Sequence, residues 1–265
     1  MRCCAATRSP SGLARASEPR RDHLHASAIF SRPLDGWKRR EDGSLMLQSK
    51  RQISWFALAA AFQIVWVIAA SVAFGALRPG YSASRAISEL GAQGSVNALA
   101  WNVIGFGGSA VLYALFATAI AAGFGRGWLF RLTVVEAIAL AASGVFSCDL
   151  GCPAVMVTPQ GWLHTVGGLT YFGTAIVVPF VAFLTFRRRP EWQSLAIFSL
   201  VIGVLLTALF VAGPFVFGAD RVGIWQRTTL ITIFVWAAVV GYRLFGLLRQ
   251  TEAPSRLTPT LQRSD

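Results

Sequence analysis

The sequence predicts an all-α, polytopic integral membrane protein, a bundle of six transmembrane helices. The 265 residues are 54% hydrophobic and only 14% charged, whereas soluble domains average about 25% charged residues. The apolar residues also fall into six runs, and each is long enough to cross the bilayer core, which takes about 20 helical residues. The runs cover approximately residues 53–77, 97–123, 128–146, 163–186, 194–217 and 228–248.

Runs of this length are predicted to be helices because lipid offers no hydrogen-bonding partners to an irregular backbone, and barrel strands would alternate in polarity over about ten residues. Residues 1–52 are basic and rich in serine, and residues 249–265 are polar. Both segments have too little apolar surface to bury, so we expect them to be disordered tails. Met46 lies just before the first run, and translation from Met46 instead of Met1 is a further hypothesis.

Positive charge alternates between the connections of the six runs. Of the 24 Lys and Arg, 20 lie in the two tails, in the second and fourth connections or in the adjoining ends of the runs, and four lie in the other three connections. The positive-inside tendency then predicts the cell inner (plasma) membrane with both termini in the cytoplasm. Although the net charge is +12, no basic stripe marks a soluble domain, which argues against nucleic acid as a partner. The predicted partner is the lipid bilayer; protein partners stay open.

The third connection, residues 147–162, carries no Lys or Arg and contains Cys148 and Cys152. Cysteines four residues apart on the oxidising side of the membrane favour a disulfide, with Gly151 allowing the turn. Two thiolates with Asp149 and His164 could instead hold zinc, or the cysteines could be unpaired. We favour the disulfide and therefore predict no metal site.

Carboxylates are scarce in the apolar region, and three of its five lie one each in the three outer connections. Asp149 precedes His164, which begins the fourth run, so the pair could act as a general acid or base with an orienting carboxylate. The alternative for His164 is a hydrogen bond to a loop carbonyl. With Glu89 from the first connection, Asp149 and His164 are the candidate catalytic residues.

The first connection, from Tyr81 onward, is expected to form a short interfacial helix. Ser82 or Ser84 could cap its start, and Gly91 could end it. Glu89 would then point toward water or toward a partner such as Arg227.

Glu136 is the only acid deep inside a run. An ionisable group at that depth is a functional hypothesis by default, and a proton-coupled transporter would need one. The alternatives are a neutral carboxyl that hydrogen-bonds a neighbouring helix, or a pair with Arg131.

Four groups of residues resemble, in order, the motifs of a bacterial and archaeal membrane family catalogued as domain of unknown function 998. They are Tyr81-Ser82 with Ile87-Ser88-Glu89-Leu90-Gly91-Ala92, Asn102 with Gly105-Phe106, Gly144 to Pro153 with His164, and Gly223-Ile224-Trp225-Gln226-Arg227. The resemblance covers about residues 55–245. It implies a six-span membrane protein, brings no established activity, and points again to Glu89, Asp149, His164 and Arg227. Glu136 lies outside the matched motifs. Arg227, Asn102 and Glu136 are the candidate binding residues.

Three classes of function remain, and the cofactor is unknown. The favoured one is a structural or partner-binding membrane protein with a polar cluster on its outer face. The first alternative is a membrane-embedded, hydrolase-like enzyme that acts on a lipid or small molecule through Asp149, His164 and Glu89. The second is a proton-coupled transporter that uses Glu136.

Overall fold

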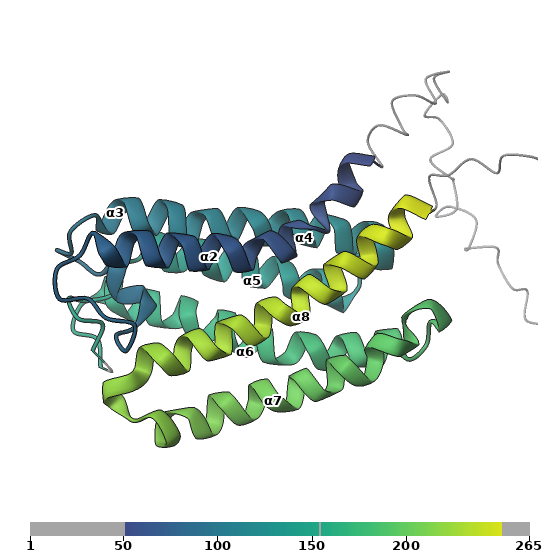
Figure 1. Ribbon diagram of the computed structural model, residues 1–265. Coiled ribbons are helices and arrows are strands. Elements are labelled where there is room, and N and C mark those ends of the chain that lie inside the picture. Colours follow the sequence, from purple (N-terminus) through teal and green to yellow (C-terminus); the bar gives the residue numbers. More distant parts are fainter. Residues whose placement is uncertain (1–50, 154, 251–265) are drawn as a thin grey trace, which may run out of the picture. The chain divides into compact units, whose positions relative to one another are not determined.

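A computed structural model describes residues 51–153 and 155–250 of the chain. This part is helical, and it contains six helices that are long and apolar enough to cross a membrane, which confirms the predicted fold class (Figure 1). Their bounds are α2 Ala59–Ala76, α3 Ala98–Trp101 continuing through η2 Asn102–Gly107 into α4 Gly108–Phe124, α5 Trp128–Val145, α6 Pro159–Phe186, α7 Gln193–Phe217 and α8 Val222–Gln250. Most of both predicted tails, with Met46, lies outside the described residues.

The six spans pack as a closed ring. Each packs against its neighbours in sequence, and α2 also packs against α8. The α2–α8 contact is close because Gly241 has no side chain: a Cβ at that position would lie 3.2 Å from the Cβ of Ala60 in α2 and 2.3 Å from the carbonyl oxygen of Ala57 just before α2. Small residues permit such close approach where no hydrophobic force drives helices together in lipid.

Three helix boundaries differ from the apolar runs. α6 begins at Pro159, four residues before its run, because the Thr158 side chain caps it by accepting a hydrogen bond from the Gly161 N–H. A proline at the first helical position fits this start, since its missing N–H would have no intrahelical partner. α8 begins at Val222, six residues before its run. Residues 51–56 are helical but separate from α2, which begins at Ala59.

The second span contains a π-helical segment, η2, over Asn102–Gly107. Gly105 lies against the Trp101 indole, since a Cβ there would be 2.9 Å from that ring. π-Helical turns are uncommon and occur often at functional sites. Here the segment contains Asn102, which reaches the loops at the end of the bundle.

Candidate functional site

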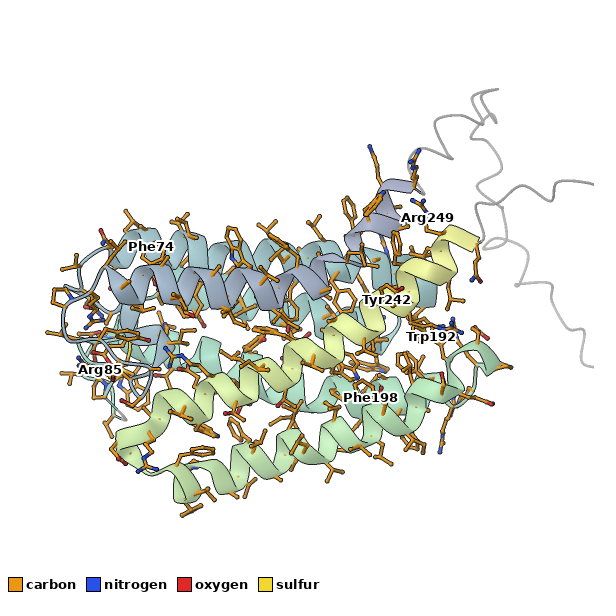
Figure 2. All side chains as sticks on the ribbon, viewed as in Figure 1. Phe74, Arg85, Trp192, Phe198, Tyr242 and Arg249 are labelled. Carbon is orange, nitrogen blue, oxygen red and sulfur yellow. A yellow bond between two sulfur atoms is a disulfide. The ribbon has the colours of Figure 1, made fainter. Side chains whose placement is uncertain are left out.

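Three connections, the last together with the start of α8, meet at one end of the bundle and form what we call the cap: residues 78–97, residues 146–153 with 155–158, and residues 218–227. Figure 2 shows Arg85 at this end, whereas Trp192 and Arg249 lie at the opposite end. Short 3-10 helices lie in the cap, η1 at Ile87–Gly91 and η4 at Ala219–Arg221. The candidate residues from the sequence can now be placed within the cap or below it.

The first connection enters the bundle and does not lie on its surface. All five residues of η1 are buried, and η1 packs against α2, α3 and α8. The expected interfacial helix is therefore a buried 3-10 turn. Its N-cap is Ala86, and no side chain caps it. Ile87 and Leu90 supply the apolar surface that makes burial favourable, at about 25 cal/mol per Å².

The Glu89 carboxylate is buried and neutralised by two arginines. Its Oε1 lies 3.0 Å from Nη2 of Arg78 and 2.5 Å from Nη2 of Arg85. Arg78 also donates to the backbone carbonyl of Glu89. A buried charge persists only when it is paired and hydrogen-bonded in this way. The expectation that Glu89 faces water or pairs with Arg227 is corrected, because Arg78 and Arg85 occupy its carboxylate.

Arg227 ties the first connection to α8 through neutral groups. Its Nη1 donates to the carbonyls of Ala83 (2.8 Å) and Arg85 (2.9 Å), and to that of Gly223 (3.1 Å). Its Nη2 donates to the Tyr81 hydroxyl at 2.6 Å. Burial raises the pKa of Tyr81 above its ordinary value, and the Arg227 charge opposes that rise. The phenol is therefore protonated at neutral pH and can donate to the Ala86 carbonyl.

Two more hydrogen bonds join the same segments. The Gln226 side chain accepts from the Ile87 N–H at 2.7 Å, and the Gly223 N–H donates to the Ser84 carbonyl at 2.7 Å. Gly223 must be glycine for this contact, because a Cβ there would lie 2.0 Å from the Arg85 carbonyl oxygen. Gly223 and Gln226, at the start of α8, thus bind backbone groups of the first connection at Ser84 and Ile87.

The third connection is closed by a disulfide between Cys148 and Cys152, whose Cα atoms are 5.3 Å apart. The disulfide was predicted, and it removes both sulfurs from the zinc alternative. Gly151 has a φ of +81°, a conformation that glycine adopts without steric cost. The cysteines therefore hold a tight turn around Asp149.

Asp149 is hydrogen-bonded on both of its carboxylate oxygens. Thr158 donates its hydroxyl to Oδ1 at 2.5 Å and its N–H to Oδ2 at 3.1 Å, and the Val157 N–H also donates to Oδ2. Gln93 adds a donor from the first connection at 3.2 Å. The Thr158 hydroxyl contributes most to lowering the pKa of Asp149 below its ordinary value, followed by the Val157 amide. Asp149 is thus an ionised acceptor that orders its own loop.

Asn102 and Gln93 join the first and third connections. Asn102 donates through Nδ2 to the Gly91 carbonyl at 3.1 Å and to the Ser147 hydroxyl at 2.7 Å. Gln93 donates its backbone N–H to the Cys148 carbonyl at 2.9 Å. Gly91 must be glycine here, because a Cβ would lie 1.9 Å from the Asn102 side chain. Asn102 thus holds the cap together.

His164 lies on α6 beneath the third connection and is buried. Its Nδ1 is 2.9 Å from the Ser143 carbonyl and 2.8 Å from the Phe146 carbonyl. Both neighbours only accept hydrogen bonds, so Nδ1 carries a proton and donates it to them. The loop-carbonyl alternative for His164 is therefore the observed one. The ring also lines a cavity of about 70 Å³.

Glu136 lies on α5, apart from the cap. It is buried on a helix that packs against α4 and α6, and these two helices carry the hydroxyls of Tyr113 and Tyr171. Those hydroxyls are 3.0 Å apart. Arg131 stacks on Trp128 and forms none of the ion pairs found in residues 51–153 and 155–250.

The structure therefore brings Glu89, Arg227 and Asp149 into one cap, to which Asn102 binds from the second span, but it does not join Asp149 to His164. No group of three or more His, Cys, Asp or Glu within the described residues could hold a metal ion. Sequence reasoning did not single out Gln93 at all, and it quoted Tyr81 and Gln226 only within the family motifs, not as site residues. Each is a neutral polar side chain in a connection or in the first turns of α8, and nothing in its local pattern indicates a distant partner.

Six apolar spans closed by a hydrogen-bonded loop cap define the chain as a multi-pass α-helical membrane protein, whose spans imply a lipid bilayer environment. The family described as "Protein of unknown function (DUF998)" matches residues 57–243, and the chain belongs to that family. No curated protein and no solved structure matches the chain.

Proposed function

We propose that this protein is a noncatalytic, structural or partner-binding component of the inner (plasma) membrane, and that its cap is a rigid outward-facing surface. One observation carries the proposal: both candidate acids of the cap are occupied by the cap itself. Two guanidinium groups hold Glu89, and backbone and side-chain donors hold Asp149. A general acid or base must reach a proton of the substrate. These two carboxylates instead bind groups of the cap and stabilise its loops.

The cap also exposes an apolar surface, which supports partner binding. Leu150, Val155 and Val157 in the third connection are 68%, 69% and 84% exposed. Apolar side chains gathered on an exposed loop favour an interaction surface. Of the three residues of the enzyme alternative, Glu89 and Asp149 are engaged within the cap, so only His164 supports that alternative. The transport alternative retains Glu136, which is buried between helices at a distance from the cap.

Replacing Asp149 by asparagine is expected to lower the melting temperature of the detergent-purified protein. Asparagine offers one acceptor oxygen, so the donors of Val157 and Thr158 lose an ionised partner. Because the pKa of Asp149 is lowered, the stabilisation is complete above the unfolded-state pKa of about 3.9 and is lost as pH falls toward the lower folded-state pKa. The variant should lack that acid-side loss of stability.

Asp220→Asn is the matched control for Asp149→Asn, because Asp220 is exposed at the same end of the bundle. Its melting temperature should fall much less than that of Asp149→Asn, because an exposed ion pair contributes little stability. A catalytic carboxylate would give the opposite outcome, since removing a strained catalytic group leaves stability unchanged or raises it. Equal or higher stability of Asp149→Asn would therefore contradict the structural role.

The proposed topology places the cap outside the cell and both termini in the cytoplasm. A membrane-impermeant maleimide applied to intact cells should label Val157→Cys, whose parent side chain is exposed in the cap. It should label Arg126→Cys, in the connection between α4 and α5, only after permeabilisation. The wild-type chain should stay unlabelled outside until a reductant opens the Cys148–Cys152 disulfide. The reverse pattern would invert the topology.

A further inference from the structure

The wall of the ring between α2 and α8 opens toward the cap. In Figure 1 the two helices approach each other at the end away from the cap and diverge toward it. The close approach lies at Ala57 and Gly241. Where the helices diverge, a cavity of about 330 Å³ lies between them, lined by apolar side chains that include Val72, Ile231 and Phe234. This volume falls in the usual range for ligand sites, roughly 300–1,000 Å³.

This cavity, which we call the α2–α8 groove, faces the surroundings of the ring as well as its interior. Ile68 is 46% exposed, Val72 66% and Ile231 44%. In a membrane-spanning bundle, side chains exposed along the spans meet the hydrocarbon of the bilayer. The groove is therefore accessible from the lipid phase.

The groove continues at the cap into a second cavity of about 290 Å³, which we call the mouth. Ser71, Val72, Ala83 and Arg227 line both spaces. The mouth also includes Tyr81 and the exposed Ser82. One path therefore runs from a polar mouth with an arginine down into an apolar groove.

Arg227 has capacity left for an anion. Its contacts use Nη1 and one position on Nη2, and in the described part of the chain its Nε makes no hydrogen bond. A guanidinium has five N–H donors, so Nε–H and one Nη2–H stay available as a fork that suits a phosphate. No carboxylate within residues 51–153 and 155–250 pairs with Arg227.

Positive charge is in excess around the mouth. Arg78 and Arg85 share the single carboxylate of Glu89, and Arg227 has only neutral acceptors. Three arginine side chains near the mouth are thus balanced by a single carboxylate, that of Glu89. Such an unbalanced cluster at the end of a span attracts anionic groups in the lipid headgroup layer.

We propose that the mouth and the α2–α8 groove form a binding site for an anionic phospholipid, with its phosphate on Arg227 and an acyl chain in the groove. The apolar groove selects a lipid over a soluble anion, because only a lipid supplies a hydrocarbon chain at that position. The charge excess selects an anionic headgroup over a neutral one. This site is independent of the noncatalytic role proposed above.

The inner end of the groove borders the cavity that His164 lines. Val67, Ile87, Leu230 and Phe234 line both spaces. Gln63 in that cavity is 1% exposed, and its Oε1 has no hydrogen-bond partner. Because an unsatisfied buried acceptor costs free energy, the chain end of a lipid is expected to stop short of Gln63.

The test measures binding of fluorescent phosphatidylglycerol and fluorescent phosphatidylcholine, each in neutral detergent micelles, to the full-length protein. Wild-type protein should bind phosphatidylglycerol at least fivefold more tightly. Arg227→Gln should weaken that binding about fivefold, the effect of one basic side chain at a membrane surface. Arg221→Gln is the control, since Arg221 is an exposed arginine at the same end that pairs with Asp220.

A second variant narrows the groove and the mouth, both of which Ser71 lines, without changing a residue of the cap. Ser71→Phe should fill the groove and weaken binding of phosphatidylglycerol, whereas Val211→Phe, on the exposed face of α7, should not. Equal affinity for both lipids, full competition by inorganic phosphate, or wild-type binding by Ser71→Phe would each overturn the proposal. If Arg227→Gln fails to fold, Ser71→Phe still decides the outcome.

Discussion

Replacing Glu89 by glutamine is expected to lower the free energy of unfolding by about 3 kcal/mol, the lower end of the cost of breaking a buried ion pair. Glutamine has nearly the same shape but no charge, so Arg78 and Arg85 would lose their shared acidic partner. Arg78 is 12% exposed and bears most of this penalty, whereas Arg85 is 44% exposed and is partly solvated. Thermal unfolding of the purified protein in detergent measures the change.

The control for Glu89→Gln is Asp220→Asn, which breaks the Asp220–Arg221 pair on the surface of the same cap. Both side chains of that pair are more than 60% exposed, so its loss should cost at most about 1 kcal/mol. If the two variants lose equal stability, the buried ion pairs of Glu89 with Arg78 and Arg85 stabilise the protein no more than an exposed pair does.

Replacing Gly223 by alanine is expected to destabilise the protein by about 2–3 kcal/mol through overpacking. The new Cβ would lie 2.0 Å from the Arg85 carbonyl oxygen and 2.6 Å from that of Ala83. These are backbone atoms, which cannot rotate away as a side chain could, so the first connection would have to leave α8. The hydrogen bond from Gly223 to Ser84 and the contacts of Arg227 would loosen with it.

The same helix offers a matched control for Gly223→Ala. Nothing lies within 4 Å of a Cβ added at Gly246, so Gly246→Ala should stabilise α8 by up to about 1 kcal/mol through helix propensity. The two substitutions should therefore shift the melting temperature in opposite directions. A rise of the melting temperature in both would show that helix propensity, and not docking of the first connection, controls stability at Gly223.

The number of spans was predictable because it depends on a local property. A run of about 20 apolar residues must be helical in lipid wherever it lies in the chain. Helix ends were less predictable, because caps set them rather than hydropathy. Thr158 and Pro159 begin α6 before the apolar run starts. The disulfide was also predictable, since Cys148 and Cys152 lie four residues apart in one turn.

The pairing inside the cap was not predictable from local pattern. Glu89 was singled out, yet its expected partner, Arg227, lies against backbone carbonyls instead. Asp149 and His164 were expected to act together, but Asp149 binds its own loop and His164 binds the carbonyls at the end of α5. A shift of a few ångströms exchanges one such partner for another, and hydropathy does not encode shifts of that size.

The sequence by itself determined that six helices span the membrane, which connections carry positive charge, and that Cys148 and Cys152 close a turn. Each of these follows from neighbouring residues and from the lipid solvent. Only the tertiary structure decided that η1 is buried, that Arg78 and Arg85 neutralise Glu89, and that α2 and α8 diverge below Arg227 to form a groove. The physical reason is that these features depend on contacts between residues up to 146 positions apart, which exist only once the ring of helices has closed.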